Sequence, residues 1–159
     1  MKRSNLLIML FTILSLTFGS AYSQTKTENH AALTSHHKIA RNHANAIVNG
    51  QSKTLEEHKN HAKNAEENLE MAKKAHENLK STMKPEEKEK VKSHTEAIEK
   101  NHAEATKHIS NLKEELNKPK PDVSKAKSHA KQFNNSIDKA EKEHQALKKK
   151  LETPANKKP

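Results

Sequence analysis

The sequence predicts an all-α fold, an up-down antiparallel four-helix bundle with a shorter first helix, after a signal peptide. Three observations favour this fold: apolar residues recur at spacings of three and four, capping patterns precede those stretches, and proline or glycine separates them. The clearest apolar seam lies in residues 55–79 and comprises Leu55, His58, Ala62, Ala65, Leu69, Ala72, His76 and Leu79. Two of these positions hold histidine, where a bundle seam normally holds leucine.

The chain begins with a predicted secretory signal peptide, residues 1–23. Lys2 and Arg3 precede an almost wholly apolar run over residues 6–18, and residues 21–23 (AYS) supply small side chains for cleavage. A retained membrane anchor is the weaker alternative, because the apolar run is short for a membrane span. The signal is typical of bacteria. We therefore expect a periplasmic or secreted protein without stable membrane insertion after cleavage.

The first two helices are predicted from their capping patterns. The stretch TKTE (residues 25–28) is a capping box that opens a helix over about residues 27–48, and Gly50 follows its end. A second capping box, TLEE (residues 54–57), opens a helix that ends at about residue 83. The first helix is therefore the shorter of the two.

Proline marks the limits of the last two helices. Pro85 is expected in the first turn of a helix over about residues 85–117, where its missing N–H costs nothing. Pro119 and Pro121 then break the chain, and a fourth helix is expected over about residues 123–151. Short loops between long helices imply that successive helices are antiparallel neighbours.

The third and fourth predicted helices resemble repeats that are offset by 35 residues, or five heptads. The segment KSHTEAI (residues 92–98) aligns with KSHAKQF (residues 127–133). The expected organisation is therefore a signal peptide at residues 1–23, a histidine-rich helical bundle at residues 24–153, and a disordered tail at residues 154–159.

The composition limits both the core and the partners. The chain has no cysteine, so it has no disulfide and no thiolate that could bind a metal or act as a nucleophile. Hydrophobic residues make up 31%, and alanine fills many seam positions, so we expect a thin core. The net charge of +10 comes mainly from lysine interleaved with glutamate, which is typical of solvated helix faces. Proteins that bind nucleic acid favour arginine and aromatic residues, and aromatics make up only 3% here, so no nucleic-acid partner is expected.

All twelve histidines follow the predicted signal peptide. A helical projection at about 100° per residue places four of them nearest the apolar centre of their helices: His58, His76, His94 and His144. The other eight lie on the flanks of the apolar faces, and none faces fully outward: His30, His36, His37, His43, His61, His102, His108 and His129. One core histidine usually finds a hydrogen-bond partner, but twelve in an alanine-rich core are harder to satisfy. A shared divalent metal ion satisfies several imidazoles at once, so all twelve are predicted metal ligands.

Folding the chain at its predicted loops groups the histidines into three layers. One end of the bundle is expected to hold His43, His58, His61, His108 and His129. The middle layer is expected to hold His36, His37 and His102. The other end is expected to hold His76, His94 and His144, with His30 nearby. Adjacent layers would lie about 10 Å apart at 1.5 Å of rise per residue.

The segment HANAIVNGQSKTLEEHKNHAK (residues 43–63), with its repeated His-Ala pairs, resembles the small metal-binding protein family. The resemblance covers the first two predicted helices well and the last two loosely. It implies a histidine-rich periplasmic four-helix bundle that binds copper and other divalent metals, with a role in metal buffering or tolerance. By resemblance the ligand role extends to His43, His58 and His61.

An enzyme is not expected from this sequence. Ferritin-like di-metal enzymes use Glu-x-x-His pairs, and two occur here, Glu99/His102 and Glu141/His144. Glu99, however, projects about 110° from the apolar centre, so its pair does not converge inward. A haem-binding bundle is disfavoured because an alanine-lined core leaves little room.

The predicted function is therefore extracytoplasmic binding and buffering of divalent transition metals by interhelical histidine clusters. Copper, as Cu(II), is the expected cofactor, with zinc or nickel as further possibilities, since imidazole suits all three and copper heads their affinity order. The alternative is a structural or chaperone-like periplasmic helical protein with a pH-sensitive histidine seam, because an unperturbed histidine titrates near pH 6.5.

Overall fold

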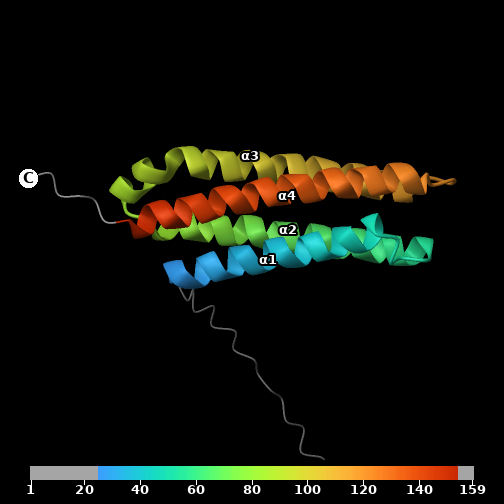
Figure 1. Ribbon diagram of the computed structural model, residues 1–159, viewed down its shortest axis with the longest axis horizontal. Coiled ribbons are helices and arrows are strands. Elements are labelled where there is room, and N and C mark those ends of the chain that lie inside the picture. Colours follow the sequence, from blue (N-terminus) through green and yellow to red (C-terminus); the bar gives the residue numbers. More distant parts are fainter. Residues whose placement is uncertain (1–24, 154–159) are drawn as a thin grey trace, which may run out of the picture.

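The computed structural model describes residues 25–153, and this part of the chain consists of four helices joined by short loops (Figure 1). The helices are α1 (Lys26–Val48), α2 (Leu55–Thr82), α3 (Pro85–Leu116) and α4 (Val123–Glu152). Their limits lie within one residue of those predicted, and α1 is the shortest with 23 residues. The all-α fold is confirmed, while the predicted signal peptide and tail lie outside the described residues.

The helix starts depend on the capping residues that the sequence indicated. Thr25 Oγ1 accepts a hydrogen bond from the Glu28 N–H at 3.2 Å, and the Glu28 carboxylate accepts one from the Thr25 N–H at 2.7 Å. Thr54 and Glu57 make the same reciprocal pair at the start of α2. Each cap stabilises its helix by about 1 kcal/mol. Gly50 has a φ of 68°, which only glycine adopts without strain, and it turns the chain from α1 to α2.

The four helices form an antiparallel array with an up-down course (Figure 1). α1 packs against α2 and α4, and α3 packs against the same two helices. The most extensive packing is within two hairpins, α1 with α2 and α3 with α4. α1 and α3 therefore face each other across the diagonal of the bundle, and side chains from both can meet at its centre.

The apolar core is divided along the length of the bundle. The larger cluster, which we call the loop-end core, lies toward the α1–α2 and α3–α4 loops and includes Ile47, Leu69, Leu112 and Phe133. A smaller one lies toward the α2–α3 turn and consists of Leu79, Met83, Val91, Ile98 and Leu147, with Leu151 packed against it. A third, of Leu33, Ala72 and Ala75, lies between these two. The predicted α2 seam is buried except for its first member, Leu55, which is 40% exposed at the helix start. Alanine fills 11 of the 24 buried hydrophobic positions among residues 25–153, which lets the helices approach closely.

Candidate metal centre

None of the twelve histidines is exposed, and all lie within the described residues. Six are buried: His30, His37, His58, His76, His102 and His144. The other six are half-buried: His36, His43, His61, His94, His108 and His129. The prediction that no histidine faces fully outward is therefore confirmed.

Five buried histidines, from all four helices, lie between the loop-end core and the apolar cluster at the α2–α3 turn, in the region of Leu33, Ala72 and Ala75. We call them the histidine core: His30 and His37 of α1, His76 of α2, His102 of α3 and His144 of α4. Each continues the seam of its helix. On α4, for example, His144 follows Ala130 and Ile137 at intervals of seven residues, and all three are buried. The helix geometry that buries alanine and isoleucine elsewhere thus buries imidazole here.

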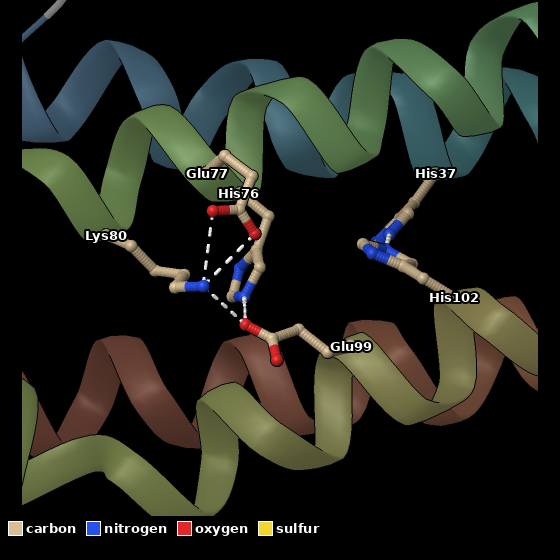
Figure 2. Close-up of polar contacts among 6 residues, drawn as sticks. All are labelled: His37, His76, Glu77, Lys80, Glu99 and His102. Carbon is tan, nitrogen blue, oxygen red and sulfur yellow. Dashed lines mark hydrogen bonds and ion pairs between the residues drawn. The ribbon is translucent and has the colours of Figure 1, made fainter.

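Two short nitrogen–nitrogen contacts join these histidines. His37 Nε2 lies 2.7 Å from His102 Nε2, across the diagonal between α1 and α3 (Figure 2). His30 Nδ1 lies 2.6 Å from His144 Nε2, and the two rings stack with centroids 4.9 Å apart. A neutral imidazole donates from one nitrogen and accepts at the other. In each pair one proton therefore lies between two nitrogens, which orients both rings.

Hydrogen bonds do not satisfy the whole histidine core. His76 is 1% exposed, yet neither of its ring nitrogens has a hydrogen-bond partner. The Nδ1 atoms of His37 and His144 are buried without a partner as well. A buried polar group without a partner costs about 1–3 kcal/mol. Each neutral imidazole has a lone pair on one of its two nitrogens, and the lone pair of His76 is free for a metal ion such as copper, zinc or nickel, so the donor set fits the predicted cofactors.

Burial keeps the histidine core uncharged. Loss of hydration, with a smaller effect of the neighbouring His102, lowers the pKa of His37 to about 2. Burial lowers the pKa of His102 and of His144 to about 3, and adjacent histidines lower both further. Burial also lowers the pKa of His30 and of His76. At neutral pH these rings are therefore unprotonated, which is the form that binds a metal ion.

Two glutamates extend the histidine core toward the surface between α2 and α3. Within residues 25–153, one group of three metal-ligating side chains has its ligand atoms within 4.8 Å of one another, and it consists of His76, Glu77 and Glu99. Figure 2 shows the imidazole of His76 from α2 approaching the carboxylate of Glu99 from α3. His76 Nε2 lies 3.9 Å from Glu99 Oε1. Lys80 also reaches both carboxylates.

Sequence reasoning missed the two glutamates. Glu99 does project outward from α3, as predicted, and it is 44% exposed. Its long side chain nevertheless reaches back along the α2–α3 interface to His76. The other Glu-x-x-His pair behaves differently, since Glu141 forms an ion pair with Arg41 at 3.0 Å. One signal in the sequence could have indicated these ligands: the adjacent residues His76 and Glu77 lie opposite the Glu99/His102 pair of the next helix.

A second group of histidines surrounds the loop-end core, as the first predicted layer implied. His43 Nδ1 of α1 lies 3.0 Å from His61 Nδ1 of α2. His58 lies near enough to His61 for its pKa to be lowered by that ring, after burial and Lys127. His108 and His129 are near neighbours on α3 and α4, and both have a buried Nδ1 without a hydrogen bond. Among residues 25–153, no three histidine ligand atoms of this group, or of the histidine core, lie within 4.8 Å of one another.

The structure departs from the other two predicted layers. His30, His76 and His144, expected at one end, lie with His37 and His102 of the expected middle layer in a single cluster.

Two histidines predicted for these layers lie outside the cluster. His36 Nδ1 lies 3.1 Å from Asn68 Oδ1 on α2. His94, expected among the most central, has its Nδ1 2.8 Å from Glu143 Oε2 and its side chain 25% exposed. The seam of α3 runs through Val91 and Ile98, so His94 falls beside it.

Two pockets on opposite sides of the bundle reach the histidine core. One, of about 710 Å³, lies between α1 and α4 and is lined by His30, Lys26, Glu87, Lys148 and Glu152 among others. The other, of about 350 Å³, lies between α2 and α3 and is lined by His76, His102, Glu77 and Glu99 among others. The histidine core therefore has a route to solvent on each of these two sides of the bundle.

The fold and the site together define a histidine-rich four-helix bundle. The chain matches no protein-family model, and comparisons with curated proteins and with solved structures found no similar protein. The resemblance to the small metal-binding protein family stays a prediction. None of the helices within residues 25–153 has the length and apolar character needed to cross a membrane.

Proposed function

We propose that the protein binds divalent transition metal ions outside the cytoplasm and buffers their concentration, copper most strongly and zinc or nickel more weakly. The observation that carries this proposal is the histidine core, in which five buried imidazoles come from four helices: four of them pair through nitrogen–nitrogen contacts of 2.6 and 2.7 Å, and the fifth, His76, packs its ring against His102. Copper is favoured because nitrogen ligands bind Cu(II) most tightly among these ions.

The paired nitrogens are close to the spacing that one metal ion needs. Metal–imidazole bonds are about 2.0–2.1 Å long, so two nitrogens on one ion lie about 2.9 Å apart in the square-planar geometry that Cu(II) favours and about 3.3 Å apart on tetrahedral zinc. The contacts of 2.6 and 2.7 Å in the core would have to open by about 0.2–0.7 Å, which small ring rotations supply. Binding would also replace the shared proton of each pair with a metal ion, and the partnerless His76 would offer one further lone pair.

Buffering is favoured over tight storage because the histidine groups differ in burial. The histidine core is buried, whereas the His43/His61 pair is half-buried and contains two ligands only. Sites with few protein ligands leave coordination positions to water and exchange their ions readily. A set of deep and shallow sites on one bundle would therefore take up and release metal over a range of concentrations.

The proposal is tested on the processed chain, residues 24–159, which contains the whole described bundle. Calorimetric titration with Cu(II), Zn(II) and Ni(II) at pH 7.5 should give saturable binding in that order of affinity. The double variant His37→Leu/His102→Leu should lose the tightest Cu(II) site, while the control His43→Leu/His61→Leu should keep it. Absence of binding at micromolar Cu(II), or a core variant that binds like the wild type, would refute the proposal.

The pH-sensitive helical protein remains the second candidate, and a specific observation favours it. The pKa values of His37, His102 and His144 lie at about 2 to 3, far below the usual 6.5. Acid would therefore drive protons into a core that excludes charge. A protein of this kind would change its state with pH alone and would show no response to Cu(II) at constant pH.

A further inference from the structure

The pocket between α2 and α3 is lined by the buried imidazole of His76 and by the exposed carboxylates of Glu77 and Glu99. His76 is 1% exposed and both of its ring nitrogens are without hydrogen bonds. Glu77 and Glu99 are 62% and 44% exposed. The pocket thus combines a desolvated imidazole with two hydrated carboxylates, a donor set that zinc accepts in proteins.

Lys80 holds these two carboxylates together. Its Nζ lies 2.6 Å from Glu99 Oε1 and 3.1 Å from Glu77 Oε1, and Figure 2 shows the ammonium group between them. Glu77 and Lys80 lie three residues apart on α2, whereas Glu99 comes from α3, so the ion pairs bridge the helices. Like charges repel at this distance, and Lys80 offsets that repulsion. The ammonium group therefore occupies the region where a cation would bind both carboxylates.

We propose that His76, Glu77 and Glu99 form a mixed nitrogen–oxygen site for a divalent cation of the zinc type, and that this cation displaces Lys80 on binding. The inference rests on the proposed function in that the same protein would be a metal binder, but it requires none of the histidine pairs. His102 lines the same pocket, so the mixed site would be the first set of ligands that an ion meets between solvent and the core.

The required rearrangement is small. The ligand atoms lie within 4.8 Å of one another and would have to close to about 3.3 Å around an ion with bonds of 2.0–2.2 Å. The backbone can stay in place, because rotation of the two exposed glutamate side chains brings their oxygens toward His76 Nε2. A divalent ion neutralises both carboxylates, and the Lys80 ammonium group then returns to water. Lys80 therefore competes with the metal ion for the site.

The first experiment isolates this competition. Zinc alone is titrated into the processed chain at pH 7.5, and affinity is measured by competition with a chromogenic chelator. Lys80→Met keeps the aliphatic stem but removes the competing cation, so zinc should bind about tenfold more tightly. Lys74→Met makes the same change in net charge on α2 at an exposed position that forms no ion pair within residues 25–153, and it should change the affinity by less than about twofold.

The second experiment tests the ligands. Glu99→Gln should abolish binding of one zinc ion, whereas Glu96→Gln, an exposed position one turn earlier on α3, should not. Circular dichroism checks that each variant folds. Equal effects of Lys80→Met and Lys74→Met, or an unchanged zinc stoichiometry in Glu99→Gln, would overturn the inference.

The two proposals fail in different ways. If the mixed site is wrong and the histidine core binds metal, Glu99→Gln behaves like the wild type while His37→Leu/His102→Leu loses its Cu(II) site. If the core is wrong and the mixed site binds, the Glu99 variant loses zinc and the core variant keeps all of its metal. If the wild type binds neither ion, both proposals are wrong.

Discussion

The histidine core and the loop-end core are built on the same seams of the same four helices, but their side chains differ. In the loop-end core the seam holds residues such as Ile47, Leu69 and Phe133, and of the five nearby histidines one, His58, is buried. In the histidine core five buried imidazoles share the centre with Leu33, Ala72 and Ala75. Burial of apolar groups stabilises a bundle, whereas burial of partly satisfied imidazoles costs free energy. Under the proposed function, the second arrangement is explained by metal binding rather than by stability.

Acidification should produce the largest difference between the two regions. The unfolded chain has histidine pKa values near 6.5, and the folded values of His37, His102 and His144 are about 2 to 3. Between these limits the unfolded state binds more protons, so the stability is complete above about pH 6.5 and falls as the pH decreases. These three histidines together lower the free energy of unfolding by about 4 kcal/mol per pH unit below about pH 5.5.

A loss of this size exceeds what a bundle with a thin core can withstand, since domains are stable by about 5–15 kcal/mol. We expect unfolding between about pH 5 and pH 4, measured by urea denaturation at a series of pH values. In His37→Leu/His102→Leu the change in the free energy of unfolding per pH unit should fall by more than half. In His43→Leu/His61→Leu most of that pH dependence should be retained. Identical slopes for the wild type and the core variant would contradict the prediction.

Binding of copper should have the next largest effect on the stability of the bundle. A ligand that binds only the folded state stabilises it by about 2.7 kcal/mol at one hundred times its dissociation constant. For a bundle of this size that corresponds to a rise in melting temperature of about 10 °C. Thermal melts with and without Cu(II) at pH 7.5 measure it, and the gain should fade below about pH 5.5 as protons compete. The rise should be much smaller in the His37/His102 variant, and a melting curve that copper leaves unchanged would argue against the histidine core.

Removal of a buried histidine pair should stabilise the metal-free bundle. His37→Leu/His102→Leu replaces two polar groups, one of which has a partnerless nitrogen, with apolar groups of similar size. The expected gain is about 1–2 kcal/mol in the free energy of unfolding at pH 7.5. The matched comparison in the loop-end core is Leu69→Ala, which should lose about 2–5 kcal/mol. A core variant that is destabilised as much as Leu69→Ala would show that the histidines contribute to stability.

The sequence predicted the fold because its signals are local. Capping boxes at Thr25 and Thr54, the turn at Gly50 and the early Pro85 each act within one turn of helix, and the seam spacing sets which face is buried. These signals agree with one another along the whole described chain. No knowledge of how distant helices pack was needed to place the helix limits to within one residue.

The site was less predictable because it depends on how diagonal helices meet. His76 and His144 were placed near the apolar centre from their own helices, and both are buried. His37 and His102 were placed on the flanks, yet they are among the most buried histidines. A projection averaged over a long helix loses the local seam, since a straight helix drifts by about 20° per heptad relative to a bundle seam. Contacts such as His76 with Glu99 depend on side-chain reach, which a projection does not contain.

The smallest effect is expected at His94, which the sequence placed with His76 and His144 and the structure places beside Glu143. Its side chain is 25% exposed and that of Glu143 is 37% exposed, so their contact is a surface interaction worth less than about 1 kcal/mol. His94→Gln should therefore change the free energy of unfolding by less than about 1 kcal/mol and leave the Cu(II) stoichiometry unchanged. His76→Ala/His144→Ala should lose as much Cu(II) as the triple variant that also carries His94→Ala, measured by equilibrium dialysis. A further loss in the triple variant would place His94 among the core ligands and restore the predicted end layer.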